Sequence, residues 1–212
     1  MRPAYFTVAP EVDADGLVAG KILTAGTVTL TGALISDGMW IAPDQTGQLL
    51  TVTSTAAETL AITVTGTDVD GKAATDTITL TAATVAVGDI HLSKVTAIST
   101  STISVGTITI GLLGEACSPT FVLNYRAQNF KTALAVIPTG TINGTVEHTF
   151  DNVYGATWTE STGTWFNHDD TALVNFTAKQ DGNYDFPPIA TRVLVNSASA
   201  SATVQYVIVC PD

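Results

Sequence analysis

The residues of this chain best suited to chemistry are acidic residues and histidines in its second half. Glu147 and His148 are adjacent, and residues 168–170 read His-Asp-Asp. These groups could assemble into a metal site or an acid–base pair, because imidazole and carboxylate groups serve both purposes. Metal ligands are usually presented together by a helix or a turn, and the spacing here fixes no such geometry. We therefore interpret these residues as surface polar residues.

A second acidic motif, DVDGK, lies at residues 68–72. Asp68 and Asp70 resemble the start of a calcium loop, but such a loop needs a third ligand two residues on and a bidentate glutamate at its twelfth position. Lys72 and Thr79 occupy those positions and supply neither ligand. Because Asp-Gly is by itself a strong turn signal, we predict a hairpin turn, with no metal and no cofactor.

The rest of the sequence offers no catalytic group. His91 stands alone, and no serine lies in a G-x-S-x-G nucleophile elbow. Cys117 and Cys210 lack metal spacing and any C-x-x-C context. A disulfide between them is geometrically possible in a sandwich, but we expect no secretory signal, and reduced thiols are then the normal state. We predict that the chain is not an enzyme.

Aromatic residues are better candidates for contact with a partner. Trp158, Trp165 and Phe166 lie within residues 151–170, which we predict to be a long loop. Aromatic side chains anchor interfaces because they bury a large area at little entropic cost. They could instead cover the edge of their own domain's core. Trp165 and Phe166 favour that alternative, since adjacent side chains of this kind suit a strand end.

The elements that position these residues are predicted to be β-strands. Within residues 48–81, apolar residues alternate with threonine in three runs. A period of two gives a strand one buried and one solvated face, and β-branched threonine suits a pleated surface. Short alternating runs recur from residue 17 onward, including 49–53 and 60–65 as separate strands, and later 133–137, 145–150, 173–178, 192–196 and 203–209. The last two are predicted to form a closing hairpin around residues 197–201.

These strands indicate an all-β fold of two tandem antiparallel β-sandwich, or barrel-like, domains with a short N-terminal arm. Residues 111–119, GLLGEACSP, interrupt the strand pattern, and no aromatic residue lies between Ile41 and Cys117, whereas many follow. Two cores of different composition imply two domains. We place the arm at residues 1–16, a Thr/Gly-rich domain at 17–114 and an aromatic-richer domain at 115–212.

The predicted arm carries two prolines and three acidic residues, together with Tyr5 and Phe6. Burying one large apolar side chain contributes roughly 1.5–3 kcal/mol. We therefore expect residues 1–16 to order against a neighbouring subunit, with Tyr5 and Phe6 as anchors. The alternative is a passive, flexible terminus.

Charge restricts the classes of partner. The net charge is −11, and only 13% of residues are charged. Nucleic-acid binding needs clustered Lys and Arg, so we expect none. No apolar run approaches the roughly 18 residues of a membrane helix, so we expect no membrane partner. A surface with few charges is typical of proteins that other subunits cover, and a homo-oligomer is expected.

Several longer motifs resemble a known group of proteins. They are ITVTGTDVDGKAATDTITL (62–80), VTAISTSTISVGTITIG (95–111), TVEHTFDNV (145–153), WFNHDD (165–170) and NYDFPPIATRVLVNSASASATVQYVIV (183–209). From residue 17 onward, the chain is similar to small β-rich virion structural proteins of tailed bacteriophages. The resemblance implies a head or tail structural protein of such a particle. Our first hypothesis within that group is a capsid decoration (cement) protein that binds and stabilises the major-capsid lattice, in a virion assembled in the host cytoplasm.

Two alternatives remain open at this point. The first is a neck or tail component of the same kind of particle, bound to other virion proteins. The second belongs to a different class, a host-surface glycan-binding module in which Trp158 and Trp165 stack on sugars.

Overall fold

The computed structural model describes residues 2–127 and 131–210. Apart from the 3-10 turns η1 (Pro43–Gln45), η2 (Glu160–Thr162) and η3 (Thr171–Leu173), the regular structure of these residues is β-strand, which confirms the predicted all-β class. Among the described residues, no helix is both long and apolar enough to cross a membrane.

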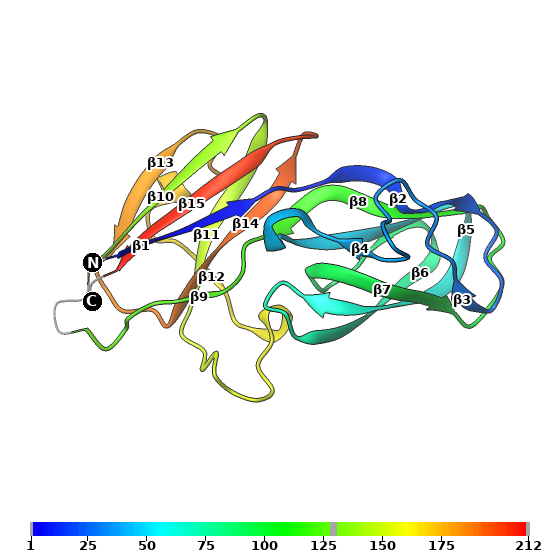
Figure 1. Cartoon of the computed structure of the whole chain (residues 1–212), viewed down its shortest axis with the longest axis horizontal. Coiled ribbons are helices and arrows are strands. Elements are labelled where there is room, and N and C mark those ends of the chain that lie inside the picture. The colour runs from blue at the N-terminus through cyan, green and yellow to red at the C-terminus, as the bar shows by residue number, and fades with distance from the viewer. Residues whose placement is uncertain (1, 128–130, 211–212) are drawn as a thin grey trace. The chain divides into compact units, whose positions relative to one another are not determined.

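The chain folds as two compact units, which can be followed by colour in Figure 1. The first unit comprises Met1–Pro10, Pro43–Thr46 and Gly114–Asp212, and the second comprises Glu11–Ala42 and Gly47–Leu113. The division after Leu113 lies one residue from the boundary that we placed after residue 114. Residues 1–16, by contrast, do not form a separate arm, because each unit takes part of them.

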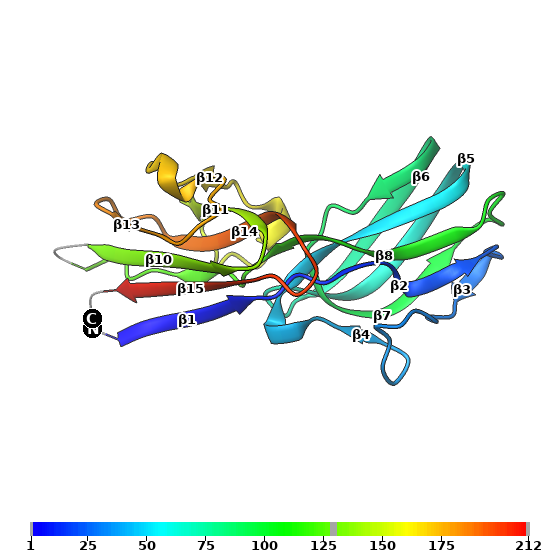
Figure 2. The ribbon, with the colours of Figure 1, turned by 90° about the horizontal axis from the view of Figure 1, so that it is seen from above.

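The first unit is a sandwich of two sheets. One sheet has the order β1 (Arg2–Val8), β15 (Thr203–Cys210), β10 (Thr132–Thr139) and β13 (Gln180–Tyr184), and Figure 2 shows the first three side by side. The other has the order β12 (Phe166–Asn167), β11 (Ile142–Thr149) and β14 (Ala190–Ala198), and β14 also pairs with β9 (Phe121–Val122) and with the end of β8 (Ile108–Cys117). Side chains of both sheets share one core, for example Val146 and Val193 from one and Leu134 and Tyr206 from the other.

Strand β1 corrects the predicted irregular arm. It pairs with β15 along its whole length, from Arg2 opposite Cys210 to Val8 opposite Val204. Val8 is buried and Phe6 is half-buried, whereas Tyr5 between them is exposed, which is the alternation of a strand with one face on a core. The prolines mislead here, because proline is tolerated in an edge strand such as β1.

Two further strand predictions in this unit are wrong. β14 and β15 belong to different sheets, so the residues between them cross from one sheet to the other and make no closing hairpin. The small-residue link lacks the Asn-Gly or Asp-Gly chemistry of a tight hairpin. Residues 173–178 are not a strand. Leu173 ends η3, Asn175 has φ of 54°, and Phe176 makes a single bridge to Gly144.

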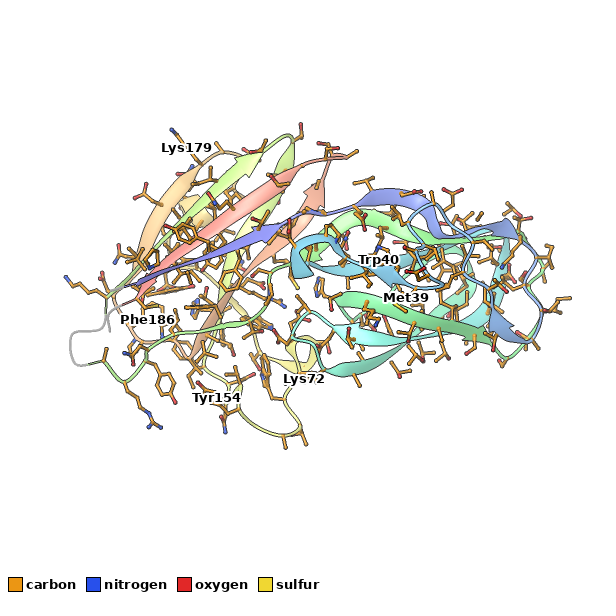
Figure 3. The ribbon with its side chains drawn as sticks, in the orientation of Figure 1. Met39, Trp40, Lys72, Tyr154, Lys179 and Phe186 are labelled. Atoms are coloured by element: carbon orange, nitrogen blue, oxygen red, sulfur yellow. The ribbon has the colours of Figure 1, made fainter. Side chains whose placement is uncertain are left out.

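The second unit is built on the hairpin of β5 (Gly47–Asp68) and β6 (Ala73–Val87). On the other side of β5, Ile62 lies opposite Thr100 and Asp68 opposite Leu92 of β7 (Leu92–Thr100). β3 (Gly26–Val28) and β4 (Trp40–Ile41) pair with β7, and β2 (Val12–Lys21) pairs with β8. Trp40 is the only aromatic residue of this unit, and it lies fully buried within it (Figure 3).

The runs at residues 49–53 and 60–65, predicted as separate strands, are one strand, β5, with shifts of register on both sides of Glu58. The predicted turn at residues 68–72 is confirmed. The Asp68 carboxylate accepts hydrogen bonds from the N–H groups of Asp70 and Lys72, at 3.0 and 2.8 Å, and Gly71 has φ of +79°. Asp68 therefore shapes the turn by binding its backbone.

Candidate functional site

The candidate site is built at the C-terminal end of β11 in the first unit. Glu147 lies opposite Asn167 of β12 and Arg192 of β14, whereas His148 lies opposite Phe166 of β12. Successive side chains of a strand point to opposite faces of the sheet. Two different clusters therefore form back to back, one around Arg192 and one around His148.

The cluster around Arg192 is a buried ion network. The Arg192 guanidinium donates to the Glu147 carboxylate through Nε and Nη2, both at 2.7 Å, and also pairs with Glu160 of the 151–170 loop. All three residues are buried. The guanidinium carbon lies 4.1 Å from the centre of the Trp165 ring, a cation–π contact. Removing one member of such a network leaves a buried charge uncompensated, so the network ties the loop firmly to the sheet.

The two tryptophans proposed as partner contacts belong to this anchor. Trp165 Nε1 donates to the Glu160 carbonyl oxygen at 3.0 Å, and the Trp158 and Trp165 rings lie edge to face with centres 6.3 Å apart. Both side chains are half-buried in their own unit. The strand that follows them, β12, places Phe166 beside His148. The loop therefore uses its tryptophans for attachment and leaves Phe166 at the surface, 48% exposed.

The cluster around His148 is aromatic. The imidazole stacks on Phe166, with ring centres 6.0 Å apart and planes at 28°. It also meets Phe150, Tyr184 and Phe186 edge to face, with ring centres 5.3–5.4 Å away. Phe150 lies two residues after His148 and so lies on the same face of the strand. Four rings thus surround one histidine.

The imidazole and the three phenyl rings line a pocket of about 470 Å³, bounded by His148, Phe150, Phe166, Asn167, Asp169 and Phe186. Phe186, labelled in Figure 3, comes from the segment that directly precedes Pro187-Pro188. The lining contains one carboxylate, one amide and one imidazole among three phenyl rings. Small-molecule sites have this composition, mostly apolar with a few polar groups.

The histidines correct our interpretation of the polar residues as a surface feature. His148, His168 and Glu147 are buried, at 3%, 5% and 8% exposure. Burial lowers the pKa of His148, while Asp169 opposes and His168 adds to this effect. Burial likewise lowers the pKa of His168, against the nearby carboxylates of Asp170 and Asp169. Both imidazoles are therefore neutral at pH 7.

A sequence signal could have revealed His148. Val146, His148 and Phe150 occupy alternate positions, so a strand that buries Val146 must place the imidazole on the same inward face. Behind it, the Thr191 hydroxyl donates to the Glu147 carbonyl at 2.8 Å and lies 2.8 Å from the Tyr206 hydroxyl. Burial raises the pKa of Tyr206 well above its usual value, so the network stays uncharged.

The other two proposed contact residues lie on β1. Tyr5 is 61% exposed, whereas Phe6 is half-buried and meets Phe121 edge to face at 5.6 Å. Phe6 therefore packs within the first unit, and of this pair Tyr5 is the residue available to a partner.

A second exposed feature lies in the second unit, in the loop between β7 and β8. Ile103 is 65% and Val105 is 76% exposed. The loop is held by Glu58, whose carboxylate accepts from the N–H groups of Val105 and Gly106 at 2.8 and 3.0 Å. Ser104 exchanges hydrogen bonds with the backbone of Leu23. Two aliphatic side chains are thus presented to solvent on a rigid support.

Neither cysteine forms a disulfide. Cys117 ends β8 and its sulfur lies 3.9 Å from a carboxylate oxygen of Glu160, while Cys210 ends β15 with its sulfur 3.7 Å from the Thr132 hydroxyl. The thiols belong to different sheets of the sandwich.

No known family model matches this chain, and no curated protein sequence matches it significantly.

Proposed function

We propose that this chain is a non-enzymatic structural protein of a tailed-bacteriophage particle, acting as a capsid decoration protein that binds the major-capsid lattice. The motifs within residues 62–111 and 145–209 that resemble virion structural proteins support the proposal. So do the all-β fold and the low share of charged residues, 13%. A decoration protein works mechanically, since many copies repeat a modest contact and gain avidity.

The observation that carries the proposal is the exposure of two aliphatic side chains, Ile103 and Val105, in the loop between β7 and β8 of the second unit. Ile103 and Val105 are 65% and 76% exposed, so a neighbouring protein that covered them would remove apolar surface from water, which is favourable. Pre-ordering of the loop by Glu58 and Ser104 removes much of the entropic cost of binding. We infer that Ile103 and Val105 contact a neighbouring virion protein, with Tyr5 as a further candidate.

Copy number on purified particles tests this function. Hundreds of copies support decoration, whereas about a dozen or fewer favour a neck or tail component. The contact itself is tested by co-sedimentation with particles that lack their own copy. We expect the I103S/V105S double variant to bind at least about tenfold more weakly, the loss from two truncated contacts of roughly 0.7 kcal/mol each. T102A, an exposed change in the same loop, is the matched control. Equal binding by all three proteins would contradict the contact.

A host-surface glycan-binding module is the second candidate. The aromatic pocket beside His148 favours it, because exposed rings next to a carboxylate and an amide are common in sugar sites. Trp158 and Trp165, which we first proposed as stacking residues, are half-buried, so Phe150 and Phe166 take that place in this alternative. Binding of the full chain to an array of surface polysaccharides, with loss in F166A, would support it.

A further inference from the structure

The aromatic pocket of the first unit presents ring faces to solvent. Phe150 is 51% and Phe166 is 48% exposed, and their ring centres lie 6.0 Å apart with planes at 59°. Phe186 lies 6.0 Å from Phe150 with planes at 31°. The face of an aromatic ring carries negative electrostatic potential and attracts a cation held within about 6 Å of its centre. Several differently inclined rings favour a compact cation over a flat ligand.

The polar groups of the lining are all able to accept a hydrogen bond. Asp169 carries the only charge, because His148 is neutral, and Asn167 contributes an amide oxygen. His148 Nδ1 is buried and has no hydrogen-bond partner. In the tautomer protonated on Nε2, Nδ1 is an acceptor.

We propose that this pocket binds the primary ammonium group of a lysine side chain from a partner protein. The ammonium has three N–H donors, which suit the exposed carboxylate of Asp169 and the amide oxygen of Asn167. Its methylene stem packs against the phenyl rings. The net charge of −11 also attracts a basic partner.

Two other ligand classes fit less well. A quaternary ammonium would satisfy the rings and the charge of Asp169, but it has no N–H group to donate to the oxygens of Asp169 and Asn167. A pyranose stacks best on one flat ring platform, whereas the planes of Phe150 and Phe166 meet at 59°. The pocket therefore favours a cation that can donate hydrogen bonds over a quaternary ammonium or a sugar.

The test is an NMR titration of the full chain with Nα-acetyl-lysine N-methylamide, followed at the phenylalanine ring resonances. Tetramethylammonium and methyl glucoside are the comparison probes. We expect the lysine analogue to shift the rings of the pocket, tetramethylammonium to bind at least about fivefold more weakly, and the glucoside to have no effect. Equal or tighter binding of tetramethylammonium, a response to the glucoside, or no response to the lysine analogue would overturn the proposal.

Variants locate the binding. D169N keeps the shape of the pocket and removes its charge, and F166A removes one ring, so each should weaken binding of the lysine analogue at least about fivefold. D181N and Y154A are matched controls, since both residues are exposed and neither lines the pocket. Unchanged binding by D169N would also overturn the proposal. These probes test the pocket alone, whereas copy number tests the particle assignment, so the two can fail separately.

Discussion

The hydrophobic cores of the two units differ in amino-acid composition. The second has an aliphatic core with one aromatic residue, Trp40, and one of its buried carboxylates, Glu58, accepts hydrogen bonds from backbone N–H groups of a loop. The first packs tyrosines and phenylalanines in its core and buries an arginine between two glutamates. An aliphatic core needs only strands of the right period. The first unit, with its aromatic core, also depends on ion pairs and hydrogen bonds between distant residues. We therefore expect its stability to be more sensitive to single polar substitutions than that of the second unit.

The largest expected effect comes from R192A. Removing the guanidinium takes away the ion-pair partner of the buried Glu147 carboxylate and the contact that ties Glu160 to the sheet, so we expect the unfolding free energy of the first unit to fall by about 3–5 kcal/mol. Urea unfolding followed by tryptophan fluorescence measures this loss. R126A is the control, since Arg126 is exposed and should change stability by less than about 0.5 kcal/mol. A loss below about 1 kcal/mol in R192A would show that the network is not a stabilising anchor.

A smaller effect is expected from E58A in the second unit. The substitution leaves the N–H groups of Val105 and Gly106 without their acceptor, and we expect a loss of about 1–3 kcal/mol. Faster hydrogen exchange should be confined to residues 101–107 and the adjacent part of β5. E115A, which alters an exposed glutamate, is the control. Unchanged exchange at Val105 and Gly106 in E58A would contradict the role of the carboxylate.

The smallest expected effect is a dependence of stability on pH. The pKa values of His148 and His168 are lowered from 6.5 by burial, so the unfolded chain binds more protons than the folded chain below about pH 6.5. The contribution of the two histidines to the unfolding free energy is therefore fully present above that pH and is lost as the solution is acidified. Each histidine contributes a slope of at most about 1.4 kcal/mol per pH unit.

The matched comparison is the H148Q/H168Q double variant, measured by urea unfolding between about pH 7 and pH 5. Raised pKa values at Asp68, Asp76 and Glu11 act in the opposite direction and are common to both proteins, so the difference isolates the histidines. Parallel pH profiles for the two proteins would show that the imidazoles are not neutral and buried.

The sequence by itself determined the strand class, the 68–72 turn and the change of core composition near residue 114. These are local properties, because a period of two and an Asp-Gly pair act within a few residues. The same signal was present in β1, where Ala4, Phe6 and Val8 alternate with Pro3, Tyr5 and Thr7, but the prolines obscured it.

Only the tertiary structure decided which strands are neighbours. Alternation tells which face of a strand is buried but not which sheet it joins, so β14 and β15 could not be assigned to different sheets from sequence. The pocket likewise depends on which strands are neighbours in the tertiary structure. Phe186, Phe166 and His148 come from three separate segments, and only the pairing of β12 with β11 brings Phe166 beside the histidine. Alternation along β11 places His148 on the inward face, but only that pairing sets Phe166 against the imidazole and so completes the lining of the pocket.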